Sequence, residues 1–208
     1  MSDAFGFCHR LNTSQGFDLT SITSLDRLGS FSPMYCYNIR PLLDYVGPSA
    51  FMNLAIAQGS SAPKVSSLTV NIRELGEQAF GNLDASLTSM SLSISQSKLP
   101  INCFHSSKLR EIKVEGEDLT SIENGAFYKC QELSAISLPS GIRQIQTNAF
   151  YNCELLTSFE FNNSLTSIGE NSFYGTGIEE AIFSNASSLR ISHNAFANTE
   201  KLKYIQFD

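Results

Sequence analysis

Apolar residues recur at one fixed interval along the chain. The clearest unit is residues 145–156, IQTNAFYNCELL, in which an aliphatic residue precedes Ala-Phe, and a small cysteine and a leucine follow. Its phenylalanine recurs with steps of 29 and 24 residues and then four steps of 23, at Phe51, Phe80, Phe104, Phe127, Phe150, Phe173 and Phe196. A constant period in the twenties is typical of solenoids, in which each repeat forms one coil stacked on the next.

Each repeat also contains a segment with the pattern L-x-x-I-x-L, as at 109–114, 133–138, 156–161 and 202–207. One polar residue separates its last two apolar positions, which is the period of a strand with one buried face. We predict that these strands pair between coils and form a parallel sheet along one side of the solenoid.

The Ala-Phe element is preceded by an asparagine at Asn148, Asn171 and Asn194. Asparagine is a good helix N-cap, so a single helical or 3-10 turn is predicted over 149–153, opposite the sheet. The residue directly before each phenylalanine is small, which indicates a close approach of neighbouring coils.

The repeat divides the chain into two regions. Residues 1–40 lack it and are predicted to form an irregular N-terminal cap, because the first coil would otherwise expose an apolar end and unpaired strand groups. A short helix over 24–28 and a strand over 35–39 are predicted within this cap. Residues 41–208 are predicted to form the solenoid of about seven coils, with an inserted surface loop at 57–64 that contains glycine and proline.

Composition narrows the range of functions. The 208 residues include 42% hydrophobic residues, 14 basic and 20 acidic side chains, and give a net charge of −6. The chain is therefore expected to fold, and its acidity argues against a nucleic-acid partner. No apolar run is long enough to insert into a membrane. No secretory signal is visible, which favours an intracellular location.

The five cysteines show neither a CxxC pair nor a Cys/His cluster at metal-binding spacing, so no metal or cofactor is predicted. Cys130 and Cys153 occupy the same slot in successive repeats, where stacked coils could bring them within disulfide distance. Thr176 and Thr199 continue that slot, which favours packing of small residues as the other interpretation.

The units LTSIENGAFYKCQELSAISLPSGIRQIQTNAFYNCELLTSFEF and SLTSIGENSFYGTGIEEAIF carry a more specific signal. They resemble the BspA-like, or Treponema pallidum type, class of leucine-rich repeats, whose unit has the pattern L-x-x-I-x-L-P-x-x-L-x-x-I-x-x-x-A-F-x-x-C. The resemblance covers residues 42–208 and implies a leucine-rich-repeat solenoid. It also implies a non-catalytic scaffold for adhesion or protein interaction, common on bacterial surfaces and expanded in some parasitic protists, with no catalytic residues to transfer.

Outward-facing residues of the predicted strands form a candidate binding face. They follow two lines: Glu111, Ala135, Ser158, Glu180 and Tyr204 on one, and Lys113, Ser137, Glu160, Ile182 and Gln206 on the other. Repeat proteins generally bind on such extended surfaces. Ile182 and Tyr204 would serve as its apolar anchors, and a merely solvated sheet face is the alternative interpretation.

A further line follows the phenylalanines and comprises His105, Tyr128, Tyr151 and Tyr174. Aromatic rows can contact sugars or partner side chains, but stacking of the rings on one another is the favoured interpretation. None of His105, His9 and His193 has a serine, cysteine or aspartate at an interpretable spacing, so we do not predict an enzyme.

The last coil contains Leu202, Ile205 and Phe207 with no polar cap after them. Solenoid ends normally need a cap, so these residues are candidates for an end-on contact in self-association or with another subunit. The sequence thus predicts a non-catalytic protein-binding scaffold and a candidate subunit of a larger assembly. The alternative function is that of a cell-surface adhesin or glycan-binding fragment.

Overall fold

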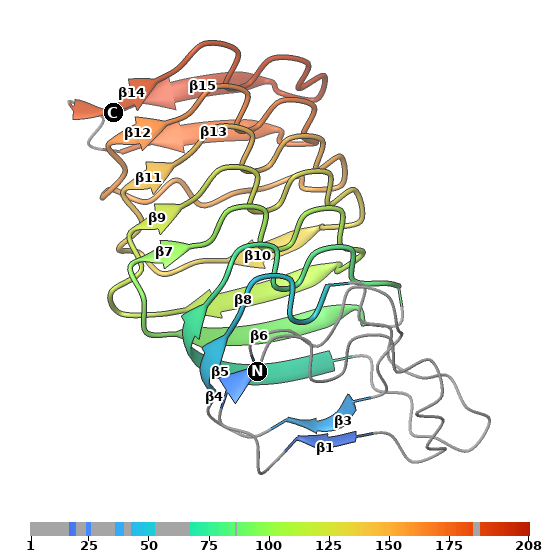
Figure 1. Cartoon of the computed structure of the whole chain (residues 1–208). Coiled ribbons are helices and arrows are strands. Elements are labelled where there is room, and N and C mark those ends of the chain that lie inside the picture. The colour runs from blue at the N-terminus through green and yellow to red at the C-terminus, as the bar shows by residue number, and fades with distance from the viewer. Residues whose placement is uncertain are drawn as a thin grey trace.

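The computed structural model of the chain describes residues 17–19, 24–25, 36–39, 43–52, 67–85, 87–184 and 188–208. These residues form short strands joined by turns (Figure 1). The strands are β1 (Phe17–Leu19), β2 (Ser24–Leu25), β3 (Cys36–Ile39), β4 (Leu43–Val46), β5 (Ser67–Leu75), β6 (Ser89–Ile94), β7 (Lys98–Leu99), β8 (Glu111–Glu115), β9 (Ser121–Ile122), β10 (Ala135–Ser137), β11 (Gln144–Ile145), β12 (Ser167–Ile168), β13 (Glu180–Phe183), β14 (Arg190–Ile191) and β15 (Tyr204–Phe207).

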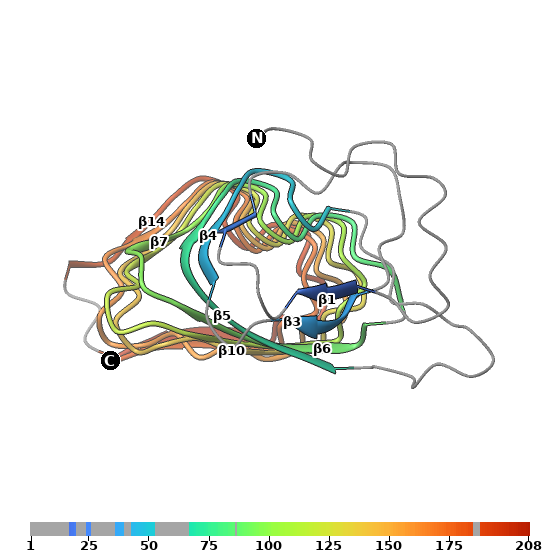
Figure 2. The same ribbon diagram turned by 60° about the horizontal axis from the view of Figure 1, so that its bottom comes forward.

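The strands pair in parallel from coil to coil, as the sequence period predicts. The longest sheet has the order β10-β8-β6-β5-β4-β2, and two-residue strands form a second sheet in the order β14-β12-β11-β9-β7. Separate pairs are formed by β13 with β15 and by β1 with β3. Viewed along the stack, the coils superimpose, with β5, β6 and β10 on one side and β7 and β14 at the adjoining end (Figure 2). This arrangement confirms the predicted solenoid.

Side chains alternate between the inside of the solenoid and its surface along the longest sheet. In β6, Met90, Leu92 and Ile94 are buried and the serines between them are partly exposed. In β8, Ile112 and Val114 are buried between exposed charged residues. The alternation of the sequence therefore places the polar ladders on the outer face of the sheet.

The phenylalanines of the repeat form one continuous stack inside the solenoid. Neighbouring ring centres lie 5.1, 5.4, 5.2, 5.1, 5.1 and 5.2 Å apart from Phe51 to Phe196, and the rings are nearly parallel. Each ring between Phe51 and Phe196 therefore packs on two neighbours, which fixes the distance between coils on this side of the molecule. The rings from Phe51 to Phe173 are buried, and Phe196 is partly buried.

The turns that carry the phenylalanines are not helical, so the predicted helical or 3-10 turn over 149–153 is wrong. The Tyr151 N–H donates to the Asn148 carbonyl of the same coil (3.1 Å), whereas the Phe150 N–H donates to the Ser172 carbonyl of the next coil (2.7 Å). This alternation continues along the turn. A helix would use all of these donors within its own coil, and here every second donor pairs with the neighbouring coil.

Most of these turns contain two residues with left-handed backbone angles. The first lies two positions before the phenylalanine, and the second lies two positions after it. Asn148 (φ 57°) and Asn152 (φ 55°) are examples. The predicted N-cap role of Asn148 is therefore wrong. It is the third residue of a β-turn with positive φ, a place that asparagine tolerates better than most residues.

The N-terminal region was predicted less accurately. The strand expected over 35–39 is present as β3, but Ser24 and Leu25, expected in a helix, form β2 and pair with Tyr45 and Val46 of β4. As a strand, β2 exchanges backbone hydrogen bonds with β4. A helical turn at the same place would leave those backbone groups of β4 without partners. The rest of that helix and the inserted loop at 57–64 lie outside the described residues.

One predicted strand is missing from the sheet. Residues 156–161 follow the strand pattern but form no strand, although β10 before them and β13 after them are strands. Phe159 and Phe161 replace the smaller Ile136 and Leu138 of the preceding coil. The Phe159 ring packs edge-on against Phe150 (5.2 Å between ring centres). The interruption coincides with the larger ring at Phe159, since a phenylalanine at the position of Phe161 also occurs within β13 and β15.

Candidate interaction surface

The predicted outward ladders are present on both sides of this interruption. Glu111 pairs with Ala135 and Lys113 with Ser137 across β8 and β10. Farther along the stack, β13 and β15 align Glu180 with Tyr204 and Ile182 with Gln206. All of these side chains are exposed. The structure thus brings the predicted candidates together as two separate patches of one outer face.

Ser158 and Glu160 were predicted as rungs that connect these two patches. Both are exposed, but they lie in the segment that forms no strand and have no ladder partner in β10 or β13. The prediction of two continuous ladders is therefore wrong at this coil.

The face extends farther toward the N-terminus than the sequence analysis proposed. Ser67 and Thr69 of β5 pair with Ser89 and Ser91 of β6. Ser89 and Ser91 pair in turn with Glu111 and Lys113 of β8. The missed signal is the strict alternation of polar and apolar residues in SLTVNI and SMSLSI, which matches the alternation used to identify the later strands.

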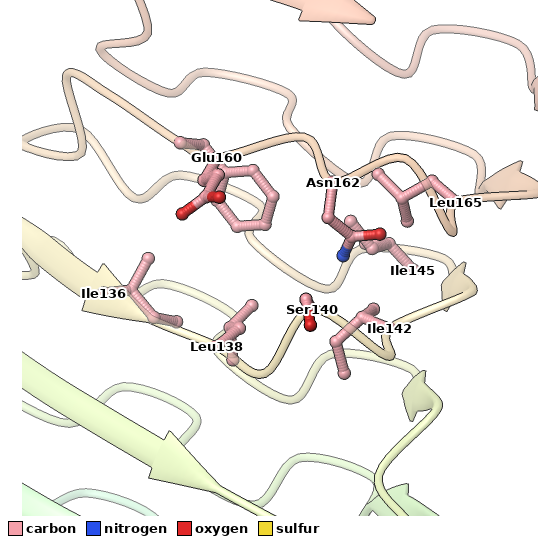
Figure 3. A pocket seen from close by; sticks show the side chains of 9 residues that line it. Ile136, Leu138, Ser140, Ile142, Ile145, Glu160, Asn162 and Leu165 are labelled. Atoms are coloured by element: carbon pink, nitrogen blue, oxygen red, sulfur yellow. The ribbon is translucent and has the colours of Figure 1, made fainter. Parts of the chain in front are cut away.

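The segment at the interruption borders a surface groove of about 540 Å³. We call it the acidic groove, and its lining residues are Thr157, Ser158, Phe159, Glu160, Phe161, Glu179, Glu180 and Ile182. On the β10 side of the same segment lies a smaller cavity of about 50 Å³. Figure 3 shows Ile136 and Leu138 on one side of that cavity and Glu160 and Asn162 on the other.

Three carboxylates, those of Glu160, Glu179 and Glu180, line the acidic groove, and none of its lining residues is basic. Glu179 forms an exposed ion pair with Lys203 (2.7 Å), and this hydrogen bond lowers the pKa of Glu179. Hydrogen bonding to the Glu180 carboxylate raises the pKa of the Tyr204 phenol. Glu160 has no hydrogen-bond or ion-pair partner among the described residues, so its carboxylate faces solvent.

The aromatic line is a stack of partly buried rings. Tyr151 lies 5.2 Å from Tyr128 and 4.8 Å from Tyr174, measured between ring centres. His105 packs against Gly81 of the preceding coil, where an added Cβ would collide with the imidazole Nε2 atom. The tyrosine faces are largely covered by one another, which supports the structural interpretation over stacking on sugars.

Burial lowers the pKa of His105 from its ordinary value of 6.5. The unfolded chain therefore takes up a proton on this side chain at a higher pH than the folded chain does. The contribution of His105 to stability is therefore complete above pH 6.5 and falls as the pH decreases toward the folded pKa. Urea unfolding between about pH 7.5 and 5 should show a shallower pH dependence for His105→Gln than for the wild type. Identical pH profiles would contradict this prediction.

The cysteine slot contains free thiols, so the disulfide interpretation of Cys130 and Cys153 is not supported. The Cys130 thiol donates to the Phe104 carbonyl (3.0 Å), and Cys153 donates to the Phe127 carbonyl (3.1 Å). The Thr199 hydroxyl makes the equivalent bond to the preceding coil (3.2 Å). This slot thus needs a small hydrogen-bond donor. Burial also raises the pKa of the Cys153 thiol, which disfavours a reactive thiolate.

The residues proposed for an end-on contact lie on the last coil. Leu202 is partly buried, whereas Ile205 is 41% and Phe207 58% exposed. Their counterparts one coil earlier, Ala181 and Phe183, are buried. The end-on contact itself stays a prediction.

In the parts of the chain that the structure describes, no helix is long and apolar enough to cross a membrane. Nor do three His, Cys, Asp or Glu side chains within those ranges come together where they could hold a metal ion. The predicted face presents carboxylates, hydroxyls, one ammonium, one amide, the aromatic ring of Tyr204 and the aliphatic side chains of Ala135 and Ile182. These groups are suited to non-covalent contacts.

Parallel coils of one repeating length, with a sheet along one side and a phenylalanine stack inside, define a leucine-rich-repeat solenoid. A model of the family described as "BspA type Leucine rich repeat region (6 copies)" matches residues 38–117 and 97–208. The chain belongs to this family, which confirms the resemblance seen in the sequence. The family generally consists of non-enzymatic repeat scaffolds.

Three solved structures of bacterial leucine-rich-repeat proteins resemble the chain. A leucine-rich cell surface protein of Faecalibacterium prausnitzii is 20% identical, with a TM-score of 0.53 over 70% of this chain and 48% of that one. The T. pallidum leucine-rich-repeat protein is 20% identical (TM-score 0.47, coverage 69% and 59%), and one from Bacteroides ovatus is 21% identical (TM-score 0.37, coverage 88% and 63%). The chain therefore spans less than two thirds of the length of each. No curated protein sequence matches the chain.

Proposed function

We propose that the chain is a non-enzymatic scaffold that binds another protein through the outer face of its sheet, as one part of a larger assembly. The observation that carries this proposal is the position of Ile182 and Tyr204. They are 41% and 43% exposed and lie on the adjacent strands β13 and β15, among polar neighbours. Protein interfaces commonly place aliphatic or aromatic anchors inside a polar rim.

Replacing Tyr204 and Ile182 together by alanine tests this proposal. We expect recovery of the partner to fall at least about tenfold, because anchors near the centre of an interface carry much of its binding energy. The measurement is quantitative affinity purification with mass spectrometry from the native cell.

A matched control is Thr69→Ala with Ser91→Ala, which changes two residues of the same face on β5 and β6. Circular dichroism should first show that both double variants are folded. Equal recovery of the partner by the wild type and by the Tyr204/Ile182 variant would refute the role of these anchors.

The alternative function is that of a surface adhesin or glycan-binding fragment. The observation in its favour is the F. prausnitzii structure, which is that of a cell surface protein, although the likeness extends to the fold alone. Protease treatment of intact native cells separates the two functions, since only a surface-exposed protein would be cleaved. The candidate end-on contact through Ile205 and Phe207 would add self-association or a subunit contact under either function.

A further inference from the structure

The acidic groove lies where the outer sheet is interrupted, which distinguishes it from the rest of the face. In the described chain, no backbone hydrogen bond joins residues 156–162 to β10. On the other side, one such bond remains, from the Glu179 N–H to the Thr157 carbonyl (3.1 Å). Main-chain groups around Ser158 and Glu160 therefore lack the pairing between coils that joins β5, β6 and β8.

The groove combines an apolar floor with an apolar rim. Phe161 is buried and Phe159 partly buried, and both belong to the ring cluster around Phe173. Ile182 lies on the rim, with 41% of its surface exposed. A side chain placed against Ile182 would remove apolar surface from water on both partners, which favours binding.

The charges of the groove determine which sign of charge a ligand must carry. Glu160, Glu179 and Glu180 line it. Two basic side chains lie nearby: Lys203 pairs with Glu179, and the charge of Lys201 also lowers the pKa of Glu179. The whole chain also carries a net charge of −6. Nucleic acid would be repelled by these carboxylates, whereas a basic ligand would be attracted.

We propose that the acidic groove binds an extended, positively charged segment of a partner protein, with basic side chains at Glu160 and Glu180 and an apolar side chain against Ile182. This inference rests on the proposed function, because it names the chemistry of the partner and the part of the face that it contacts. Peptides commonly bind in extended form where strand backbone groups are unpaired, and pockets for alternate side chains give specificity.

A designed peptide tests the proposal directly. The probe is fluorescein-labelled Lys-Ser-Ile-Ser-Lys-Ser-Ile-Ser-Lys. In the extended form every second side chain faces the same side, so one side of this peptide presents lysine and isoleucine in alternation. Fluorescence anisotropy with the whole chain should show saturable binding that weakens as salt is added. Replacing lysine by glutamate in the peptide should abolish binding, and replacing isoleucine by serine should weaken it.

Variants locate the binding. Glu160→Lys with Glu180→Lys should weaken peptide binding at least about tenfold, because it reverses two charges at the contact. The matched control is Glu117→Lys with Asp118→Lys, which makes the same change in net charge at exposed residues of the turn after β8. The control should bind within about twofold of the wild type, since exposed charges farther away than a Debye length are largely screened.

Three results would overturn the proposal: no saturable binding of the basic peptide, equal loss in both charge variants, or equal binding of the acidic peptide. A dimer in sedimentation experiments that the Glu160/Glu180 variant abolishes would assign the groove to a second copy and also overturn it. If the Tyr204/Ile182 variant loses the native partner but the Glu160/Glu180 variant retains it, the groove inference fails and the proposed function stands. If neither variant loses the partner, both fail.

Discussion

Phe150→Ala is expected to lower the free energy of unfolding by about 3–5 kcal/mol. The Phe150 ring is fully buried, stacks on Phe127 and Phe173 at 5.1 Å, and meets Phe159 edge-on at 5.2 Å. Its removal would leave a cavity in the middle of the stack, and the coils on either side could not close it without breaking their hydrogen bonds. Because the chain has no tryptophan, urea unfolding should be followed by far-ultraviolet circular dichroism.

The matched control is Tyr151→Ala at the next position, where the ring is only partly buried. We expect this change to cost about 1–2 kcal/mol, since a ring that is only partly buried loses less apolar surface, although it also stacks on two neighbours, Tyr128 and Tyr174. Phe150→Leu should lie between the two. A loss at Phe150 no larger than that at Tyr151 would show that the phenylalanine stack does not hold the coils together.

Gly169→Ala should be nearly as harmful, although it adds a single methyl group. A Cβ at Gly169 would lie 2.6 Å from the Gln146 carbonyl carbon and 2.6 Å from the Thr147 nitrogen of the preceding coil. These are backbone atoms whose positions are set by stacking, so the coils would have to separate locally. We expect a loss of about 3 kcal/mol, the upper part of the range for overpacking, measured by the same unfolding experiment.

Gly141→Ala is the control for this substitution. The nearest atom to a Cβ there is the Leu119 carbonyl oxygen at 3.4 Å, which is ordinary contact. Neither glycine has left-handed backbone angles, so the comparison isolates the space between coils. We expect Gly141→Ala to change stability by less than about 1 kcal/mol, because alanine also restricts the unfolded chain. Similar losses at both glycines would disprove the steric explanation.

The pairing of the outer ladders can be predicted from the sequence because the repeat has a nearly constant length. Residues about one period apart must lie in adjacent coils, as Glu180 and Tyr204 do at a separation of 24 residues. The acidic groove could not be predicted in the same way. Residues 156–161 alternate as the true strands do but form no strand, and no local signal in them distinguishes this coil from its neighbours.

The turn conformation was another feature that local signals could not reveal. An asparagine before a short apolar segment is typical both of a helix N-cap and of a left-handed turn residue. The choice between them depends on where the backbone donors pair. At Phe150 the donor pairs with Ser172 in the next coil, a partner that exists only once the coils are stacked.

The period and the apolar pattern of the chain alone determine that it forms stacked coils, that phenylalanines lie inside, and that polar ladders face outward. Those features depend on residues that recur at nearly equal spacing, so the same prediction follows independently from each repeat. The tertiary structure alone determines the left-handed turns, the donor role of the cysteine slot and the interruption that forms the acidic groove. Each of these depends on the fit between neighbouring coils, where ring volume and hydrogen-bond pairing override the local pattern of any one repeat.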